Sequence, residues 1–239
     1  MFSIFNRKCS VLESGILAKV EDRHSHILYG VDDGVRTEED SLAILAWMRG
    51  LGLRALWLTP HIMEDIPNTT AALRSRFDGL VSVADTGGIS MHLAAEYMID
   101  NLFERRLEEG DLLCMEDNMV LMETSIWSAP YRLPEILDAV MRAGYRPLLA
   151  HPERYRYMEM KDYGRLADMG VRLQMNLPSL IGCYGRTERD KAGKLLADGM
   201  YSYVGSDCHS FHAVRRMYSE KSLERKDVKR IEDMSDIVN

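Results

Sequence analysis

Cysteine is scarce in this sequence, and long apolar runs are missing from it. The 239 residues include only four cysteines, which form no CxxC pair. This pattern excludes a disulfide framework and a thiolate zinc site, and it favours a reducing compartment. No stretch approaches ~18 consecutive apolar residues without a charge, so the sequence predicts no membrane span.

Positive charge is also in deficit. The chain has 30 Lys and Arg residues against 37 Asp and Glu residues, which gives a formal net charge of −7. Such a field repels nucleic acid and anionic membranes, so neither is expected as a main partner. The apolar start of the chain is interrupted at Asn6 and lacks a small-residue cleavage site, so no signal peptide is predicted. We expect a soluble, cytoplasmic protein.

Short apolar runs alternate with longer amphipathic segments along the chain. Seven runs have the character of strands: residues 16–22, 54–59, 89–95, 118–122, 146–150, 171–176 and 201–205. Helices are predicted at residues 36–49, 70–84, 133–143, 162–169 and 187–198. This order predicts an α/β fold with a parallel sheet, and seven units approach the number that closes a barrel. We expect one domain over 1–239, with its core at about 16–216 and a charged helix or tail at 217–239.

Metal-binding residue types gather where the predicted strands end. Five of the seven histidines lie there, together with several carboxylates. Because the carboxyl ends of parallel strands meet at one edge, these side chains are predicted to converge. The candidates are His24, His26, Asp33, His61, Glu96, Glu123, His151, Asp207 and His209.

His24 and His26 are two residues apart, which places both imidazoles on one face of an extended strand. On its own this pair fits hydrogen-bonding histidines as well as a metal site. The four carboxylates favour the metal site, because without cations they would repel one another. Imidazole and carboxylate ligands without thiolate suit Mn²⁺, Fe or Zn²⁺, and nine ligands predict two or three ions.

The expected charge of such a site favours an anionic substrate. Three divalent ions, four carboxylates and one bridging hydroxide sum to about +1, so phosphate is the natural ligand. We expect the hydroxide shared between the ions to attack phosphorus, with Arg154 spreading the charge of the transition state. Cys208 lies between Asp207 and His209 but lacks the CxxxxxR loop that cradles phosphate. We interpret it as a packing residue.

The order of the motifs resembles that of a known superfamily. They are DRHSH at 22–26, DDG at 32–34, LTPH at 58–61, AE at 95–96, MET at 122–124, HPER at 151–154 and SDCH at 206–209. The chain thereby resembles the PHP (polymerase and histidinol phosphatase) superfamily from about residue 22 to residue 212. Within it, the chain is most similar to the manganese-dependent protein-tyrosine phosphatases of bacterial capsule and exopolysaccharide loci.

The resemblance implies a distorted seven-stranded (β/α)7 TIM-like barrel, the PHP fold, that removes phosphate from phosphotyrosine. The implied substrate is the cytoplasmic tail of a membrane tyrosine autokinase, and assembly into a homo-oligomer is also implied. Three ions are implied: one on His24, His26, Asp207 and a shared Glu96, a second on Glu96, Glu123 and His151, and a third on Asp33, His61 and His209.

The resemblance also assigns further roles. Arg154, Asp207 and His209 become the catalytic residues, with Arg154 on the phosphate, and Asp22 becomes a residue that orients an imidazole. The family's second phosphate-binding arginine falls at Val214 here, with Arg215 and Arg216 directly after it. Either arginine could take that role, and of the two we name Arg215.

Other functions are weighed against this one. A small-molecule phosphomonoesterase similar to histidinol phosphatase would use the same metals on another leaving group. An amidohydrolase typically has a lysine on the fourth strand, where this sequence has Glu123. A nuclease lacks support because no basic stripe is present. A docking module without activity is disfavoured, because all nine ligand positions keep metal-binding chemistry.

Overall fold

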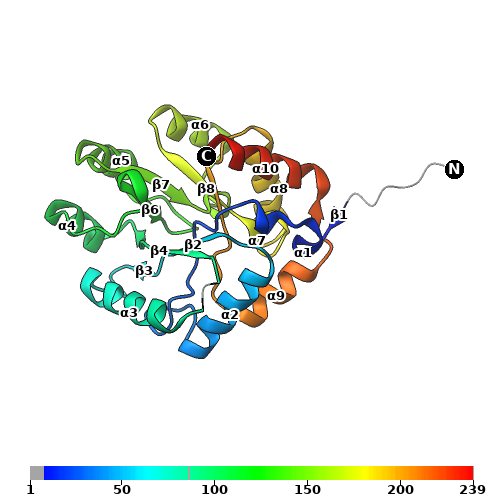
Figure 1. Cartoon of the computed structure of the whole chain (residues 1–239). Coiled ribbons are helices and arrows are strands. Elements are labelled where there is room, and N and C mark those ends of the chain that lie inside the picture. The colour runs from blue at the N-terminus through cyan, green and yellow to red at the C-terminus, as the bar shows by residue number, and fades with distance from the viewer. Residues whose placement is uncertain (1–7, 86, 239) are drawn as a thin grey trace.

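The structure, a computed structural model, describes residues 8–85 and 87–238 (Figure 1). Its centre is a six-stranded parallel sheet in the order β3-β5-β6-β7-β8-β9, with a separate parallel pair β2-β4. These strands are β2 (Ala55–Leu58), β3 (His61–Ile62), β4 (Ser90–Leu93), β5 (Glu96–Met98), β6 (Met119–Glu123), β7 (Arg146–Ala150), β8 (Arg172–Asn176) and β9 (Tyr203–Gly205).

The sheet is curled, and residues 22–26 lie between β2 and β9, the last strand of the sheet. On one side, the amide of Asp22 donates a hydrogen bond to Ala55 of β2 (3.0 Å). On the other, the amide of Arg23 donates to Val204 of β9 (3.0 Å). The segment that carries the HxH pair is therefore held by backbone bonds to both neighbours, although it forms only isolated bridges.

Helices lie outside the strands, as Figure 1 shows. They are α1 (Val11–Ser14), α2 (Glu38–Gly50), α3 (Thr70–Val83), α4 (Asn101–Glu109), α5 (Leu133–Arg142), α6 (Met160–Asp168), α7 (Leu177–Leu180), α8 (Arg186–Ala197), α9 (Phe211–Ser219) and α10 (Arg225–Val238). Three short 3₁₀ turns accompany them: η1 (Ile16–Ala18), η2 (Glu116–Asn118) and η3 (Pro152–Arg154). Side chains cap several helices at the start, as Thr37 does for α2 and Ser210 for α9.

The strands are buried on both faces, as parallel strands usually are. In β6, Val120 and Met122 belong to the large core that the helices cover, whereas Met119 and Leu121 belong to a second, smaller core. The second core lies among the strands themselves and includes Trp57 of β2 and Tyr203 of β9. The metal-binding residue types follow the strands at the edge beyond these two cores.

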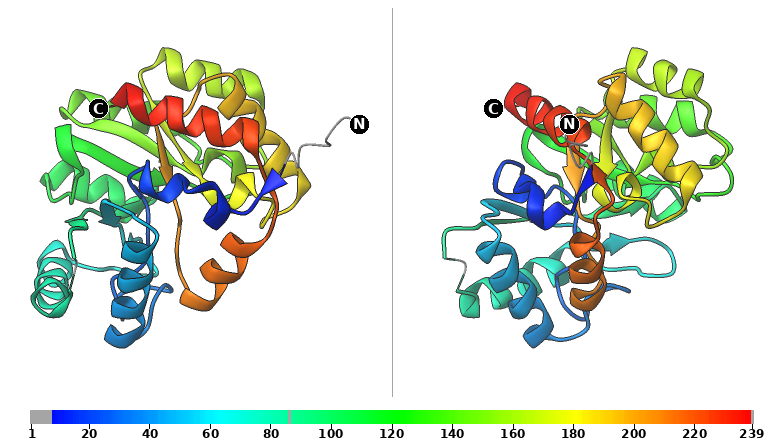
Figure 2. Two further views of the ribbon diagram at one scale, coloured as in Figure 1. Left: turned by 45° about the vertical axis from the view of Figure 1, so that its right-hand side comes forward. Right: turned by 90° about the vertical axis from the view of Figure 1, so that its right-hand side faces the viewer.

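The chain ends are tied together. Strand β1 (Lys8–Cys9) pairs antiparallel with β10 (Leu223–Glu224). From β10, α10 runs back beside α8 and η1 (Figure 2). Ile231 of α10 is fully buried. The charged segment 217–239 thus contains the predicted helix, but part of that helix is packed rather than solvated.

Several predicted elements need correction. The strand predicted at 16–22 is wrong, since Ile16–Ala18 forms the turn η1 and only Asp22 makes a bridge, with Leu56. Ile16 and Leu17 are both buried, a pattern that suits a turn packed on the core better than an alternating strand. The strand predicted at 89–95 ends at Leu93, and β5 begins at Glu96.

The sequence also missed α4. The described residues form a six-stranded parallel sheet and a separate pair, so the predicted count of seven strands is not confirmed. What the structure supports is a mixed α/β fold with a curled parallel sheet. The described helices include none that combines the length and the apolar character of a membrane span. Most of the segment tested for a signal peptide, residues 1–7, lies outside the described residues.

Candidate metal centre

The nine candidate ligands come together at the carboxyl ends of the strands. They surround a cavity of about 360 Å³, whose wall includes seven of them. The ligands are His24 and His26 on segment 22–26, Asp33 in the following loop, His61 on β3, Glu96 on β5, Glu123 at the end of β6, His151 after β7, and Asp207 and His209 after β9.

Within this cluster the ligand atoms form four small groups, each with all atoms within 4.8 Å of one another. The groups are His24, His26 and Asp207; His24, Glu96 and His151; His61, Glu96 and Glu123; and His26, Asp33, His61 and His209. Four residues each belong to two of these groups: Glu96, His24, His26 and His61. Such sharing is the arrangement that neighbouring cations require.

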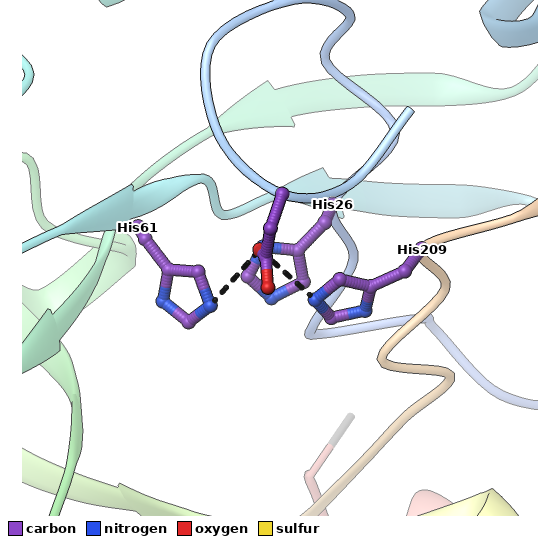
Figure 3. A group of neighbouring side chains, drawn as sticks. His26, His61 and His209 are labelled. Carbon is purple, nitrogen blue, oxygen red and sulfur yellow. Dashed lines mark ion pairs between the residues drawn. The ribbon is translucent and has the colours of Figure 1, made fainter. Parts of the chain in front are cut away.

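The last group shows how distant segments converge. Figure 3 shows the imidazoles of His26, His61 and His209 facing one another from three different segments. Asp33 Oδ1 lies 3.6 Å from His61 Nε2 and 3.5 Å from His209 Nε2, the two ion pairs dashed in the figure. This group matches the implied third site, with His26 added to it.

The protonation of His24 and His26 is set by partners on the far side of each ring. His24 Nδ1 lies 2.9 Å from Gln174 Oε1, and His26 Nδ1 lies 2.8 Å from Asp32 Oδ2. Both acceptors take a proton from Nδ1, so in the neutral form of each ring Nε2 presents a lone pair. These two Nε2 atoms are 3.0 Å apart. Two lone pairs at that distance repel each other, and a shared cation removes the repulsion.

Glu96 Oε2 is the clearest sign of a cation site. This buried oxygen makes no hydrogen bond. Nevertheless, three imidazole nitrogens surround it: His24 Nε2 at 3.1 Å, His26 Nε2 at 3.2 Å and His61 Nδ1 at 3.2 Å. An orphaned carboxylate oxygen among ring nitrogens fits a divalent cation. The donor set of imidazole and carboxylate therefore fits a metal centre.

Glu123, the neighbouring carboxylate, also indicates a cation site. Burial raises the pKa of Glu123 well above its ordinary value, and the charge of Glu96 raises it further. Without a cation, both effects favour the protonated form of Glu123. Burial also disfavours charge on Glu96, but His24 and His61 outweigh this and hold its pKa well below the ordinary value. A bound cation would keep both groups ionised.

Two ligands occupy unusual backbone conformations. His151 has φ 33° and ψ 51°, and Asp207 has φ 50°, so both lie in the left-handed region that few side chains adopt. Each sits directly beyond the end of its strand. Such strain is concentrated at functional sites, where the surrounding structure maintains it.

Arg154 is the positive side chain of the cavity. Its Nη1 donates to Asp207 Oδ2 (3.1 Å), and its guanidinium lies 4.5 Å from the ring centroid of Tyr184. Asn176 Nδ2 also donates to Asp207 Oδ2 (2.7 Å), and the Tyr184 hydroxyl lies 3.3 Å from the same oxygen. These donors hold Oδ2, while Oδ1 faces His24 and His26.

Three other predicted residues are placed differently from the ligands. Asp22 Oδ1 accepts from the amides of Ser206 (2.8 Å) and His24 (3.3 Å), so it contacts backbone and not an imidazole. Arg215 is exposed on α9 with its guanidinium over Phe211, and it does not line the cavity. Cys208 borders the cavity but is 1% exposed, and burial raises the pKa of its thiol.

Sequence reasoning missed the residues that support the ligands. Asp32 and Gln174 orient His26 and His24, while Asn176 and Tyr184 contact Asp207. Asp32 stands beside the predicted Asp33, so the DDG motif contained this information. Gln174 and Asn176 are two residues apart on β8, so their side chains lie on the same face of the strand. Their residue types alone, however, suggest no role.

Comparison with known proteins identifies the family. Residues 20–234 match the family model described as "Capsular polysaccharide synthesis, CpsB/CapC". Tyrosine-protein phosphatase CpsB of Streptococcus pneumoniae is 30% identical over 203 residues, covering 79% of this chain and 82% of that protein. Tyrosine-protein phosphatase YwqE of Bacillus subtilis (strain 168) is 27% identical over 208 residues, covering 82% of each chain.

A solved structure of this family has a similar fold. It comes from a study of YwqE from Bacillus subtilis and CpsB from Streptococcus pneumoniae, described as metal-dependent tyrosine phosphatases. The TM-score is 0.76 at 24% identity, and the match covers 89% of this chain and 85% of the other. The chain therefore belongs to the CpsB/CapC family of capsular polysaccharide synthesis.

Proposed function

We propose that this protein is a metal-dependent protein-tyrosine phosphatase. The observation that carries the proposal is Glu96 Oε2, a buried carboxylate oxygen without a hydrogen bond among three imidazole nitrogens. Arg154 on the wall of the same cavity supplies a positive charge for a phosphate. The relatives named tyrosine-protein phosphatases support the same activity.

The nine ligands would hold two or three divalent ions, with Mn²⁺ preferred over Fe and Zn²⁺. His24, His26, Glu96 and Asp207 would hold one, Glu96, Glu123 and His151 a second, and Asp33, His61 and His209 a third. Bound there, divalent ions would lower the pKa of water and neutralise the oxygens of the phosphoryl group. Oxygen and nitrogen ligands without thiolate are consistent with Mn²⁺.

The chain's own residues would orient the substrate and its surroundings. Arg154 would donate hydrogen bonds to the phosphate as the Asp207 contact is exchanged for the substrate. Asp207 would stay in place, because Asn176 continues to donate to its Oδ2. Asp207 and His209 would complete the catalytic set as ligands, while Arg215 would reach a phosphate only if α9 moved.

The physiological setting belongs to the same proposal. A phosphorylated cytoplasmic tail of a membrane tyrosine kinase in capsule or exopolysaccharide synthesis would be the substrate. We also infer that residues 1–239 form one domain that works in the cytoplasm, as a homo-oligomer. The hydrogen bonds of segment 22–26 support counting it as the first strand of a distorted seven-stranded barrel.

A small-molecule phosphomonoesterase is the second candidate, because metals and Arg154 would act on any accessible phosphomonoester. The cavity of about 360 Å³ is large enough for either a phosphotyrosine side chain or a small metabolite. An amidohydrolase is less suitable, since Glu123 and Asn176 end β6 and β8 where that class uses lysine and histidine. A docking module without activity would have no use for nine converging ligands.

A substrate panel tests the proposed function. Phosphotyrosine peptide, histidinol phosphate and single-stranded DNA are each incubated with the Mn²⁺-loaded protein and with chelator. We expect phosphotyrosine to be hydrolysed fastest, chelation to abolish the activity, and re-added Mn²⁺ to restore it. Faster hydrolysis of histidinol phosphate would favour the second candidate, and activity that survives chelation would contradict both.

A further inference from the structure

Two exposed aromatic rings follow strands at the edge of the sheet that carries the candidate ligands, and one of them lines the cavity. Trp127, in the loop after β6, is 65% exposed, and Tyr184, beyond β8, is 38% exposed. An arginine from the loop after β7 stacks on each ring. Arg156 lies 4.2 Å from the centroid of the Trp127 ring, and Arg154 lies 4.5 Å from that of Tyr184. We call these four residues the arginine–aromatic rim.

The order of the strands sets the order of the rim. Strands β6, β7 and β8 are neighbours in the sheet. Trp127 therefore lies on the β6 side, the two arginines in the middle, and Tyr184 on the β8 side. The amide of Arg156 donates to the carbonyl of Ile126 (2.8 Å), which joins the loops after β6 and β7.

The two arginines face different surroundings. Arg154 lines the cavity, and its side chain is 26% exposed with Asp207 as its partner. The Arg156 side chain is 53% exposed, and the nearest carboxylate oxygen paired with it, on Glu188, is 3.7 Å away. Two residues of chain span at most about 7 Å. The backbones of residues 154 and 156 are thus close, and Arg156 carries the more exposed positive charge of the two.

We propose that the rim recognises an acidic residue next to the phosphotyrosine of the substrate. This rests on the proposed function. Arg156 pairs with the acidic side chain, and the Trp127 face packs against the neighbouring part of the peptide. The protein carries a formal net charge of −7, so its overall field repels such a peptide. A local positive charge beside the cavity offsets that repulsion and selects the acidic sequence.

Two matched peptides test the proposal. Both carry phosphotyrosine, one flanked by glutamate and the other by lysine, and kcat/KM is measured for each with the full-length, Mn²⁺-loaded protein. We expect the wild type to prefer the glutamate peptide by about tenfold. Arg156→Gln should reduce this ratio, and Arg156→Glu should invert it. The ratio is independent of the overall activity of each preparation.

Arg142→Glu is the matched control. Arg142 is exposed on α5 and pairs with Asp138, and it lies at the end of the helix that leads into the amino end of β7. This variant makes the same change in net charge, so it should keep the wild-type ratio. Peptides with a non-hydrolysable phosphotyrosine analogue, measured by fluorescence polarisation, should follow the same order of affinity.

The outcomes separate the two proposals. A wild-type protein that hydrolyses neither peptide contradicts the proposed function itself. A wild type that hydrolyses both peptides equally, or an Arg142→Glu variant that shifts the ratio as far as Arg156→Glu, contradicts only the role of the rim. Loss of binding to phosphatidylglycerol vesicles in Arg156→Glu, with an unchanged peptide ratio, would assign the rim to a membrane surface instead.

Discussion

At the scale of single residues, the chemistry of this site is imidazole and carboxylate chemistry rather than thiol chemistry. Cys208 is next to Asp207 and is the one cysteine on the cavity wall among the described residues. Its side chain is almost fully buried, and burial raises the pKa of its thiol. A nucleophilic cysteine needs the opposite shift, toward a thiolate at neutral pH.

Replacement of Cys208 by serine tests this distinction. Because serine is similar in size and the thiolate has no role, Cys208→Ser should keep at least about half of the wild-type kcat. Burying the hydroxyl lowers the free energy of unfolding by about 1–2 kcal/mol. Steady-state kinetics on phosphotyrosine peptide provide the measurement, with a thermal melt to exclude unfolding. A folded variant without activity would overturn the metal-based account.

Asp32 is the residue through which one ligand position is held. It accepts from His26 Nδ1 (2.8 Å), from the amide of His61 (3.0 Å) and from the amide of Gly34 (3.0 Å). Burial opposes its charge, but the contact with His26 outweighs this and lowers the pKa of Asp32 below its ordinary value. It is therefore a carboxylate that fixes the imidazole tautomer.

Asp32→Ala should weaken Mn²⁺ binding by about 10- to 100-fold, because His26 and the loop that carries Asp33 lose their common anchor. Calorimetric titration of the metal-free protein with Mn²⁺ measures this directly. Excess Mn²⁺ should restore part of the activity, which distinguishes a positioning residue from a ligand. Asp65→Ala, at an exposed loop position, is the control. Equal affinities for the two variants would show that Asp32 has no such role.

At the scale of elements, glycine allows the first segment to approach the sheet. A Cβ atom at Gly205 of β9 would lie 2.5 Å from His24 Cβ and 2.7 Å from Gln174 Nε2. Gly34 is equally restricted, since a Cβ there would collide with the backbone and Cβ of His26. The HxH segment and its neighbours can meet only because these two positions carry no side chain.

Gly205→Ala should therefore displace His24 and Gln174. We expect a loss of about 1–3 kcal/mol in the free energy of unfolding, together with weaker metal binding. Gly79→Ala on α3 is the matched control, because a Cβ there meets no atom within 4 Å. In that exposed helical position alanine should stabilise the protein by about 1 kcal/mol. Urea unfolding of both variants decides the matter, and equal stabilities would contradict the close approach.

Sequence and structure agree best where residue type itself carries the chemistry. All nine candidate ligands converge, because the carboxyl ends of parallel strands meet at one edge of the sheet. The prediction failed for segment 16–22, where an apolar run formed a turn. It also missed α4, whose buried residues are only Leu102, Phe103 and Arg106. This apolar stripe is too short, among so many charged residues, to indicate a helix. Gln174 and Tyr184 act through distant partners, which local sequence does not reveal.

At the scale of the whole molecule, the metal centre joins the ends of the curled sheet. Segment 22–26, β3, β5 and the residues after β9 all contribute ligands, although they are far apart in the sequence. Without cations, buried carboxylates and imidazoles at this junction must compensate one another. Cations that bind the folded state alone stabilise the entire fold.

Mn²⁺ should accordingly raise the melting temperature. At a metal concentration 100 times the Kd, one site adds about 2.7 kcal/mol to the free energy of unfolding. For a chain of this size that corresponds to roughly 5–10 °C per site. Differential scanning calorimetry with Mn²⁺ and with chelator provides the comparison. The double variant His24→Ala/Asp207→Ala should lose most of this gain, and an equal gain in the variant would contradict binding at this centre.

The most direct test of the central claim is a crystal structure of the Mn²⁺-loaded protein with anomalous data collected at the manganese edge. We expect two or three anomalous peaks among the nine ligands, with one of them adjacent to Glu96 Oε2. A map without anomalous peaks at this edge of the sheet, from crystals grown with excess Mn²⁺, would contradict it.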